Sequence, residues 1–357
     1  MEEQDVEMKG PEVQSSSKRS EIETKENLPF IEKYRPNKLS EVISHEKIIA
    51  TIKKFIEKNS LPHLLFHGPP GTGKTSCIFA FAKEVYGDAF KTLVLEMNAS
   101  DDRGINIVRD KIISFCSSSN SLSNMIRGSQ KDLGYLERNF KLVILDEADM
   151  ITSAAQFALR RVMEKYHKNV RFCIICNNVH MIIPAIQSRC MRFRFCPLKK
   201  EQCLTRVKQI LGYENIQYEN EETLYKAIEI GNGDMRNILN LVESTYMSYG
   251  RITLNGIYTS SGLPSDEDIQ KIITIGANKS IKFNDAMKQI EDLLANGAFE
   301  TGDIIASLTK AIKNNKSVDK VLKTKMFLEL AQLDNLMRIG GSSKSSLFAI
   351  VTMLRDY

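Results

Sequence analysis

The sequence predicts an α/β domain, with a parallel sheet covered by helices, followed by two all-helical domains. Short runs of β-branched and aliphatic residues alternate with stretches of helical spacing over residues 28–198. This alternation is typical of parallel strands joined by crossover helices. Beyond that boundary, apolar residues recur only at helical spacing, with breaks near Gly276, Gly297 and Gly340-Gly341.

Each expected strand is a short apolar run with few charges. The expected strands are residues 63–67 (HLLFH), 92–97 (TLVLEM), 141–146 (KLVILD), 171–176 (RFCIIC) and 191–195 (MRFRF). In the last run phenylalanines alternate with arginines, which predicts a half-buried edge strand. Helical spacing is clearest at residues 105–115 and 154–166.

Composition divides the chain further. Residues 1–27 carry eight acidic and four basic side chains with almost no large apolar ones, so we expect a disordered acidic tail. The α/β domain, 28–198, contains a Ser/Asn-rich polar insertion at 117–139. Residues 199–262 read as three or four short helices, and residues 263–357 as a second helical domain.

The overall composition excludes some classes of protein. With 42% hydrophobic and 26% charged residues among 357, the chain has the profile of a soluble globular protein. No apolar run approaches the ~18–20 residues of a membrane span, so we expect no membrane association. The opening MEEQDVEMKG lacks the features of a signal peptide. Outside the tail the net charge is near +9, which favours polyanionic partners without identifying one.

The seven cysteines lie scattered in apolar runs, which indicates reduced thiols in the cytosol or nucleus. Cys173 and Cys176 have zinc-like spacing, but no second ligand pair lies nearby. We therefore expect two buried thiols there.

The strongest motif is GPPGTGKT, from Gly68 to Thr75, between an expected strand and an expected helix. This is the G-x-x-x-x-G-K-[ST] pattern, in which glycines let backbone N–H groups surround phosphates. Lys74 then reaches the β/γ-phosphates and Thr75 coordinates Mg²⁺, so the motif predicts binding of ATP or ADP with Mg²⁺. The expected nucleotide-binding residues here are Gly68, Pro69, Pro70, Gly71, Thr72, Gly73, Lys74, Thr75 and Ser76.

The second motif, LVILDEAD, is an apolar strand that ends in two adjacent carboxylates, Asp146 and Glu147. Carboxyl ends of parallel strands are where α/β sheets bind ligands. We expect Asp146 to hold Mg²⁺ through water and Glu147 to polarise the attacking water. Together the two motifs predict an ATP hydrolase.

Three further polar residues matter only in combination. Asn177 ends the strand RFCIIC, Arg189 lies in QSRC and Arg236 lies in GDMR. Each alone is more typical of a surface or capping residue. Asp234, in the same GDMR segment, is a good helix N-cap.

In this order the motifs resemble the AAA+ ATPases called clamp loaders, and the eukaryotic clamp loader, replication factor C, in particular. The resemblance covers residues 28 to about 260 closely and the helical C-terminus in general character. It implies an AAA+ module, a helical lid and a C-terminal collar for oligomerisation. The segments that carry it are LPFIEKYRP, LPHLLFHGPPGTGKT, NASDDRGI, FKLVILDEAD, ALRRVMEKY, IIPAIQSRCMRFRF and GDMRNILN.

The resemblance also implies roles for single residues. Asn177 would be the sensor that orients the lytic water, and Arg236 the second sensor, on the γ-phosphate. Arg189 would be an arginine finger acting in trans on the neighbouring subunit's ATP. Ile31 and Arg35 would line the nucleotide from the N-terminal side.

The partners implied by the resemblance are four other replication factor C subunits, the sliding clamp PCNA and primer–template DNA. The ATPase would be stimulated by clamp and DNA, and the protein would be nuclear. Arg103 and Arg109 would contact the DNA backbone, which is a sequence-independent and salt-sensitive contact.

Two alternatives remain. A homohexameric branch-migration motor of the AAA+ class would share the phosphate loop, acids and sensors, although the SRC finger argues against it. A structural collar subunit would bind nucleotide without hydrolysing it. The intact Lys74, Thr75, Asp146 and Glu147 argue against the second alternative.

Overall fold

The computed structural model describes residues 28–58, 60–100, 105–117, 140–297, 299–315 and 319–356. The chain forms two compact units. One comprises the chain up to residue 215 together with 227–243, and the other comprises 216–226 and the chain from 244 onward. The expected tail lies outside the described residues. So does the expected insertion, except that Ser117 is the last residue of α6 (Ile105–Ser117).

A parallel five-stranded sheet forms the centre of the first unit, with the order β2-β3-β4-β1-β5. The strands are β1 (His63–His67), β2 (Val94–Asn98), β3 (Lys141–Asp146), β4 (Val170–Cys176) and β5 (Cys190–Arg194). In this register Asp146 lies beside Asn98, and His67 lies beside Cys176. The chemistry-bearing ends of β1, β3 and β4 therefore meet at one edge of the sheet, as the sequence predicts.

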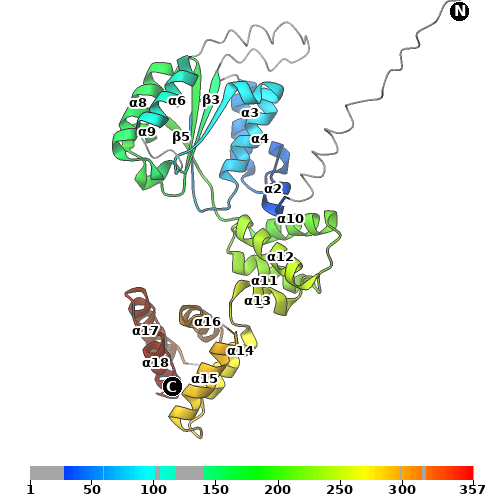
Figure 1. Cartoon of the computed structure of the whole chain (residues 1–357), viewed down its shortest axis with the longest axis vertical. Coiled ribbons are helices and arrows are strands. Elements are labelled where there is room, and N and C mark those ends of the chain that lie inside the picture. The colour runs from blue at the N-terminus through cyan, green and yellow to red at the C-terminus, as the bar shows by residue number, and fades with distance from the viewer. Residues whose placement is uncertain are drawn as a thin grey trace, which may run out of the picture. The chain divides into compact units, whose positions relative to one another are not determined.

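Helices cover both faces of the sheet (Figure 1). On one face, α3 (Glu46–Glu57) and α4 (Lys74–Tyr86) pack over a core that includes Phe66 and Ile144. On the other, α6 and α8 (Ser153–Tyr166) pack over a core that includes Val143. Alternate residues of β3 thus enter opposite cores, because side chains of a strand point alternately to its two faces. The predicted α/β layering is confirmed.

β1 and β3 have the expected boundaries, whereas the boundaries of the other three strands differ by one or two residues. Thr92 and Leu93 belong to α5 (Phe90–Leu93), so β2 begins at Val94. Aliphatic residues are compatible with either state, and packing of this short helix decides between them. β4 starts one residue earlier than expected, and β5 is shifted back by one residue. β5 is nevertheless the predicted edge strand.

After β5 the described residues form helices and no further strand, apart from an isolated bridge between Tyr218 and Ile252. Four of these helices, within the range where three or four were expected, are α10 (Lys200–Tyr213), α11 (Glu221–Gly231), α12 (Met235–Tyr249) and α13 (Leu254–Ser261). Then come α14 (Asp266–Ala277), α15 (Phe283–Gly297), α16 (Thr301–Asn314), α17 (Lys320–Arg338) and α18 (Ser343–Asp356). The sequence did not predict the break between α16 and α17. Among the described residues, no helix combines the length and apolarity needed to cross a membrane.

Shorter helical turns complete the first unit. They are α2 (Phe30–Lys33), η1 (Leu39–Glu41), η2 (Gly87–Ala89), η3 (Ala148–Met150), η4 (Val179–Met181) and α9 (Pro184–Gln187). Asp234 caps α12 as expected, since its Oδ1 accepts the backbone N–H groups of Arg236 and Asn237 at 2.8 and 3.2 Å.

The C-terminal helices share one apolar core, and Ile272 of α14 lies fully buried in it. We expect Ile272→Ala to destabilise this unit by about 2–5 kcal/mol, because truncation removes buried methyl groups and leaves a cavity. Urea unfolding of the full chain measures the loss. Leu328→Ala is the control, because Leu328 is 61% exposed and should change the free energy of unfolding by only about 0.5 kcal/mol. If both substitutions lowered the free energy of unfolding equally, the placement of Ile272 in a buried core would be contradicted.

Candidate nucleotide-binding site

The loop between β1 and α4 has the backbone conformation that phosphate binding needs. Gly71 and Gly73 adopt φ values of +63° and +87°, a left-handed region that side chains disfavour. A Cβ on Gly71 would lie 1.5 Å from Asp234 Oδ1, whereas one on Gly73 would meet no atom within 4 Å. The loop therefore packs closely on the start of α12 at Gly71. At Gly73 it leaves open space in front of the α4 N-terminus, where phosphate oxygens bind favourably.

Lys74 lies at the centre of the site and is only 7% exposed. Its Nζ donates hydrogen bonds to the carbonyl oxygens of Gly68 (2.9 Å) and Pro69 (2.7 Å) and to Asn177 Oδ1 (2.9 Å). Burial lowers the pKa of Lys74, and Asp146 is the main charge that opposes this shift. A bound phosphate would place a negative charge next to this desolvated ammonium group and stabilise its charged form.

Thr75 and Asp146 supply oxygen ligands suited to Mg²⁺. The Thr75 hydroxyl donates to Asp146 Oδ2 at 2.8 Å, so the first turn of α4 and the end of β3 meet. A hydroxyl and a carboxylate are the protein donors that phosphate-loop enzymes offer to hydrated Mg²⁺, and this pair fits that ion. Glu147 follows with φ +52°, and its backbone N–H donates to Asp146 Oδ1 at 2.9 Å.

Asn177 follows the last residue of β4, and its position is fixed by Asp149. Asp149 Oδ2 accepts the backbone N–H groups of Asn177 and Asn178, both at 3.1 Å. The Asn177 side chain is thereby held beside Lys74. Sequence reasoning did not assign Asp149, although it is the last residue of the DEAD segment, which could have suggested it.

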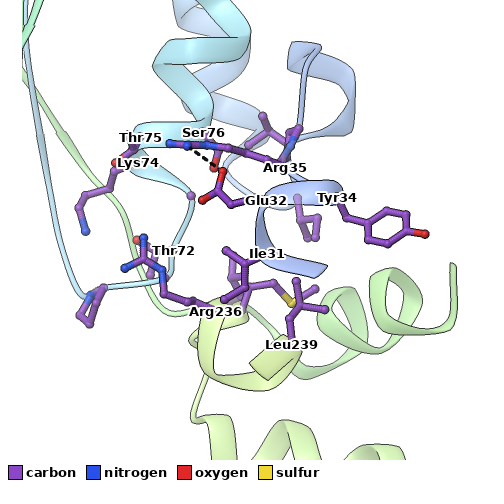
Figure 2. A pocket seen from close by; sticks show the side chains of 18 of the residues that line it. Ile31, Glu32, Tyr34, Arg35, Thr72, Lys74, Thr75, Ser76, Arg236 and Leu239 are labelled. Carbon is purple, nitrogen blue, oxygen red and sulfur yellow. Dashed lines mark hydrogen bonds and ion pairs between the residues drawn. The ribbon is translucent and has the colours of Figure 1, made fainter. Parts of the chain in front are cut away.

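The other walls of the pocket come from α2 and α12 (Figure 2). Ile31 and Arg35 line it from the N-terminal side and Arg236 from the first turn of α12. The backbone N–H of Met235 donates to the carbonyl oxygen of Gly71 at 3.2 Å, so α12 begins directly on the phosphate loop. The structure thus brings together the motifs on β1, β3, β4 and α12 in one pocket.

The pocket differs from the expected set of residues in two ways. Gly68 and Pro69 do not line it; they turn their carbonyl oxygens to Lys74 instead. Several lining residues were not predicted. Five of them lie in the quoted segments LPFIEKYRP and GDMRNILN but were given no role there, and the other four are brought in by packing. The unpredicted lining residues are Glu32, Tyr34, Pro36, Val42, Ile43, Leu198, Arg206, Met235 and Leu239.

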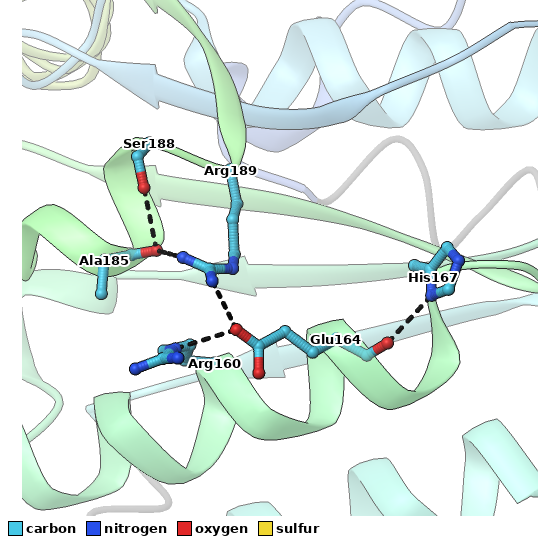
Figure 3. Close-up of polar contacts among 6 residues, drawn as sticks. All are labelled: Arg160, Glu164, His167, Ala185, Ser188 and Arg189. Carbon is cyan, nitrogen blue, oxygen red and sulfur yellow. Dashed lines mark hydrogen bonds and ion pairs between the residues drawn. The ribbon is translucent and has the colours of Figure 1, made fainter.

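Arg189 is not among the residues that line this pocket. It follows α9, where its Nη1 donates to the carbonyl oxygen of Ala185 at 2.6 Å and its Nη2 lies 2.5 Å from Glu164 Oε1 (Figure 3). Arg160 Nε contacts the same oxygen at 2.9 Å. The guanidinium group is therefore held on the surface of α8.

The two expected DNA-contacting arginines are not tested. Arg103 lies outside the described residues, and of Arg109 the structure describes only the backbone, in α6. Cys173 and Cys176 are buried thiols in β4, as expected, and burial raises the pKa of Cys176 to about 12.

Family comparisons agree with this geometry. Residues 64–198 match the family described as "ATPase family associated with various cellular activities (AAA)". A RuvB variant structure from Thermotoga maritima aligns with a TM-score of 0.50 at 15% identity, covering 75% of this chain and 86% of that chain. That likeness concerns the fold alone. Fold, site and family match define an ATP hydrolase of the AAA class.

Residues 264–352 match the family "Replication factor C C-terminal domain". Replication factor C subunit 5 of Mus musculus is 42% identical and covers 92% of this chain and 93% of its own length. Replication factor C subunit 3 of Saccharomyces cerevisiae is 37% identical, covering 94% of this chain and 95% of its own. The chain belongs to the replication factor C subunit family and is an ATPase subunit that functions in DNA replication. Its motifs resemble those of the subunit numbered 3 in yeasts and 5 in vertebrates, and the two relatives named here carry those numbers.

Proposed function

We propose that this chain is one ATPase subunit of a five-subunit replication factor C, which opens the sliding clamp PCNA and places it on primer–template DNA in the nucleus. The main support is the likeness to replication factor C subunits over nearly the whole chain, together with an intact hydrolytic site. ATP binding would assemble the subunits into a form that grips the clamp. Hydrolysis, stimulated by DNA and clamp, would release it.

The chemistry follows from the residues in the pocket. The phosphate loop and Lys74 bind the β/γ-phosphates of ATP or ADP, while Thr75 and Asp146 hold Mg²⁺. Glu147 polarises the attacking water and Asn177 orients it. Arg236 senses the γ-phosphate from the start of α12, and Arg189 completes the neighbouring subunit's site. Mg²⁺, when bound, neutralises charge that develops on the phosphate oxygens.

A second observation supports assembly with other protein subunits. Four large apolar side chains are 55–77% exposed along α17 and at the residue that follows it. At 3.6 residues per turn they fall within about 80° of arc, so they share one face of the helix. Lys325 and Gln332 are exposed in the same arc, so this face mixes apolar and polar side chains, as surfaces that contact another protein commonly do. The four residues are Val321, Leu328, Leu336 and Ile339.

Gentle purification of the tagged endogenous protein, followed by native mass measurement, tests the proposal. We expect one copy of this chain beside four related ATPases, one of them much larger. We also expect the purified complex to hydrolyse ATP faster when clamp and DNA are added. A homo-oligomer of five or six copies would contradict the proposal and favour a branch-migration motor.

DNA contact by Arg103 and Arg109 stays part of this proposal. Because phosphate contacts release counterions, substituting either residue should weaken DNA binding about equally for all sequences and flatten its salt dependence.

A further inference from the structure

The segment from Phe30 to Asn37, called the strap here, contacts two parts of the nucleotide site. Its residues Ile31, Glu32, Tyr34 and Arg35 line the pocket. One side of the strap contacts α4, the helix that begins at Lys74. The guanidinium group of Arg35 lies 4.9 Å from the centre of the Phe79 ring, and Lys83 Nζ donates to Asn37 Oδ1 at 2.6 Å.

The other side of the strap contacts α10 and α12. Arg206 Nη2 donates to the Tyr34 carbonyl oxygen at 3.0 Å, and the Phe30 N–H donates to Glu243 Oε2 at 3.1 Å. The Tyr34 and Tyr213 rings stack, with centres 6.2 Å apart and planes 8° from parallel. The strap therefore connects the helix of the phosphate loop with the helices that carry Arg206 and Arg236.

Glu214, the residue after α10, contacts two residues of the strap through one carboxylate oxygen. Its Oε1 lies 2.5 Å from Lys33 Nζ and accepts the Tyr34 hydroxyl at 2.5 Å, and its side chain is only 20% exposed. Although burial opposes ionisation, hydrogen bonds from Lys33 and Tyr34 lower the pKa of Glu214. Figure 2 shows the Tyr34 ring turned away from Lys74 and Thr75, so this hydroxyl is not directed at the phosphates.

We propose that Glu214 is a positioning residue for nucleotide binding. By holding Lys33 and Tyr34 it fixes the strap against α10, and the strap in turn forms one wall of the pocket. Because the strap is already held in place before ATP binds, binding does not have to offset the conformational entropy that ordering the strap would cost. This inference rests on nucleotide binding in the pocket and is independent of the clamp and DNA proposed as partners.

The test measures the Kd of mant-ATP with Mg²⁺, a fluorescent ATP analogue, for the full chain and its variants. Glu214→Ala should raise the Kd about 5- to 10-fold. Glu214→Gln keeps an acceptor for Lys33 and Tyr34 and should recover part of the affinity. Glu201→Ala, an exposed acid in the first turn of α10, is the matched control and should leave the Kd as it is.

A second variant separates positioning from loss of folding. Tyr34→Phe removes only the hydroxyl that donates to Glu214 and retains the ring stack. It should weaken binding, and its effect should not add to that of Glu214→Ala, because the hydroxyl of Tyr34 has no contact left to lose once Glu214 is replaced. In the assembled ATPase, KM for ATP should rise while kcat is largely kept, since Lys74, Asp146 and Glu147 are untouched.

The outcomes distinguish a failure of the proposed role of Glu214 from a failure of the nucleotide site itself. If Glu214→Ala and Tyr34→Phe bind mant-ATP like the unmodified chain while Lys74→Ala does not, the positioning role is wrong and the nucleotide site is right. If the unmodified chain itself fails to bind mant-ATP, the nucleotide site is wrong, and the role of Glu214 with it. An equal drop of kcat and kcat/KM in Glu214→Ala would also contradict positioning.

Discussion

Arg189→Ala is expected to slow ATP hydrolysis at the neighbouring subunit's site by about 10³- to 10⁵-fold, the effect of removing an arginine finger. The reason is that charge on the transferring phosphoryl oxygens then lacks a fixed cation. ATP binding at this chain's own site should be retained, because Arg189 does not line that pocket.

The measurement needs an assembly in which only the neighbouring site can hydrolyse ATP. The phosphate-loop lysines of all other sites are therefore substituted. Single-turnover hydrolysis then reports that site alone. Arg192→Ala, a nearby exposed arginine in β5, serves as the control and should have little effect. Unchanged turnover in the Arg189 variant would remove the proposed role in trans.

Lys74→Ala should raise the Kd for ATP at this site by about 10²- to 10⁴-fold. Each charge-assisted hydrogen bond contributes about 1.5–3 kcal/mol, and we expect Lys74 to make two of them to the β/γ-phosphates of bound ATP. Hydrolysis at this site stops in consequence. Equilibrium binding of ATP with Mg²⁺ to the full chain checks the prediction, with Lys91→Ala, an exposed lysine of α5, as control.

The same substitution should not lower the melting temperature of the nucleotide-free protein. Lys74 is a largely buried cation whose pKa is lowered by desolvation, so its removal relieves a cost of folding that offsets the loss of its three hydrogen bonds. Unimpaired ATP binding, or loss of binding accompanied by unfolding, would contradict this role for Lys74.

The helices illustrate where sequence patterns are strong. α6 and α8 were predicted from apolar residues at helical spacing, and the Asp234 cap was predicted from its residue type. Both are local properties, decided by residues within a turn or two of each other. The start of β2 was wrong by two residues, because Thr92 and Leu93 fit a helix or a strand and only packing selects α5.

Most of the site could likewise be predicted from the sequence. Lys74, Thr75, Asp146 and Glu147 belong to short motifs at strand ends, and parallel strands place those ends at one edge of the sheet. Asn177 follows the same logic, as the residue after β4. The order of the motifs along the chain also identified the family.

Only the tertiary structure revealed the residues that support these groups. Tyr34 contacts Arg206 and Glu214, which lie 172 and 180 residues further along the chain, and Phe30 contacts Glu243, 213 residues away. No periodicity or motif relates residues at such separations, since their pairing depends on how whole helices pack. The sequence by itself thus determined the chemistry of phosphate binding and hydrolysis, because that chemistry is carried by local motifs. The tertiary structure decided how the pocket wall is held and that Arg189 lies apart from its own chain's pocket, because both depend on long-range packing.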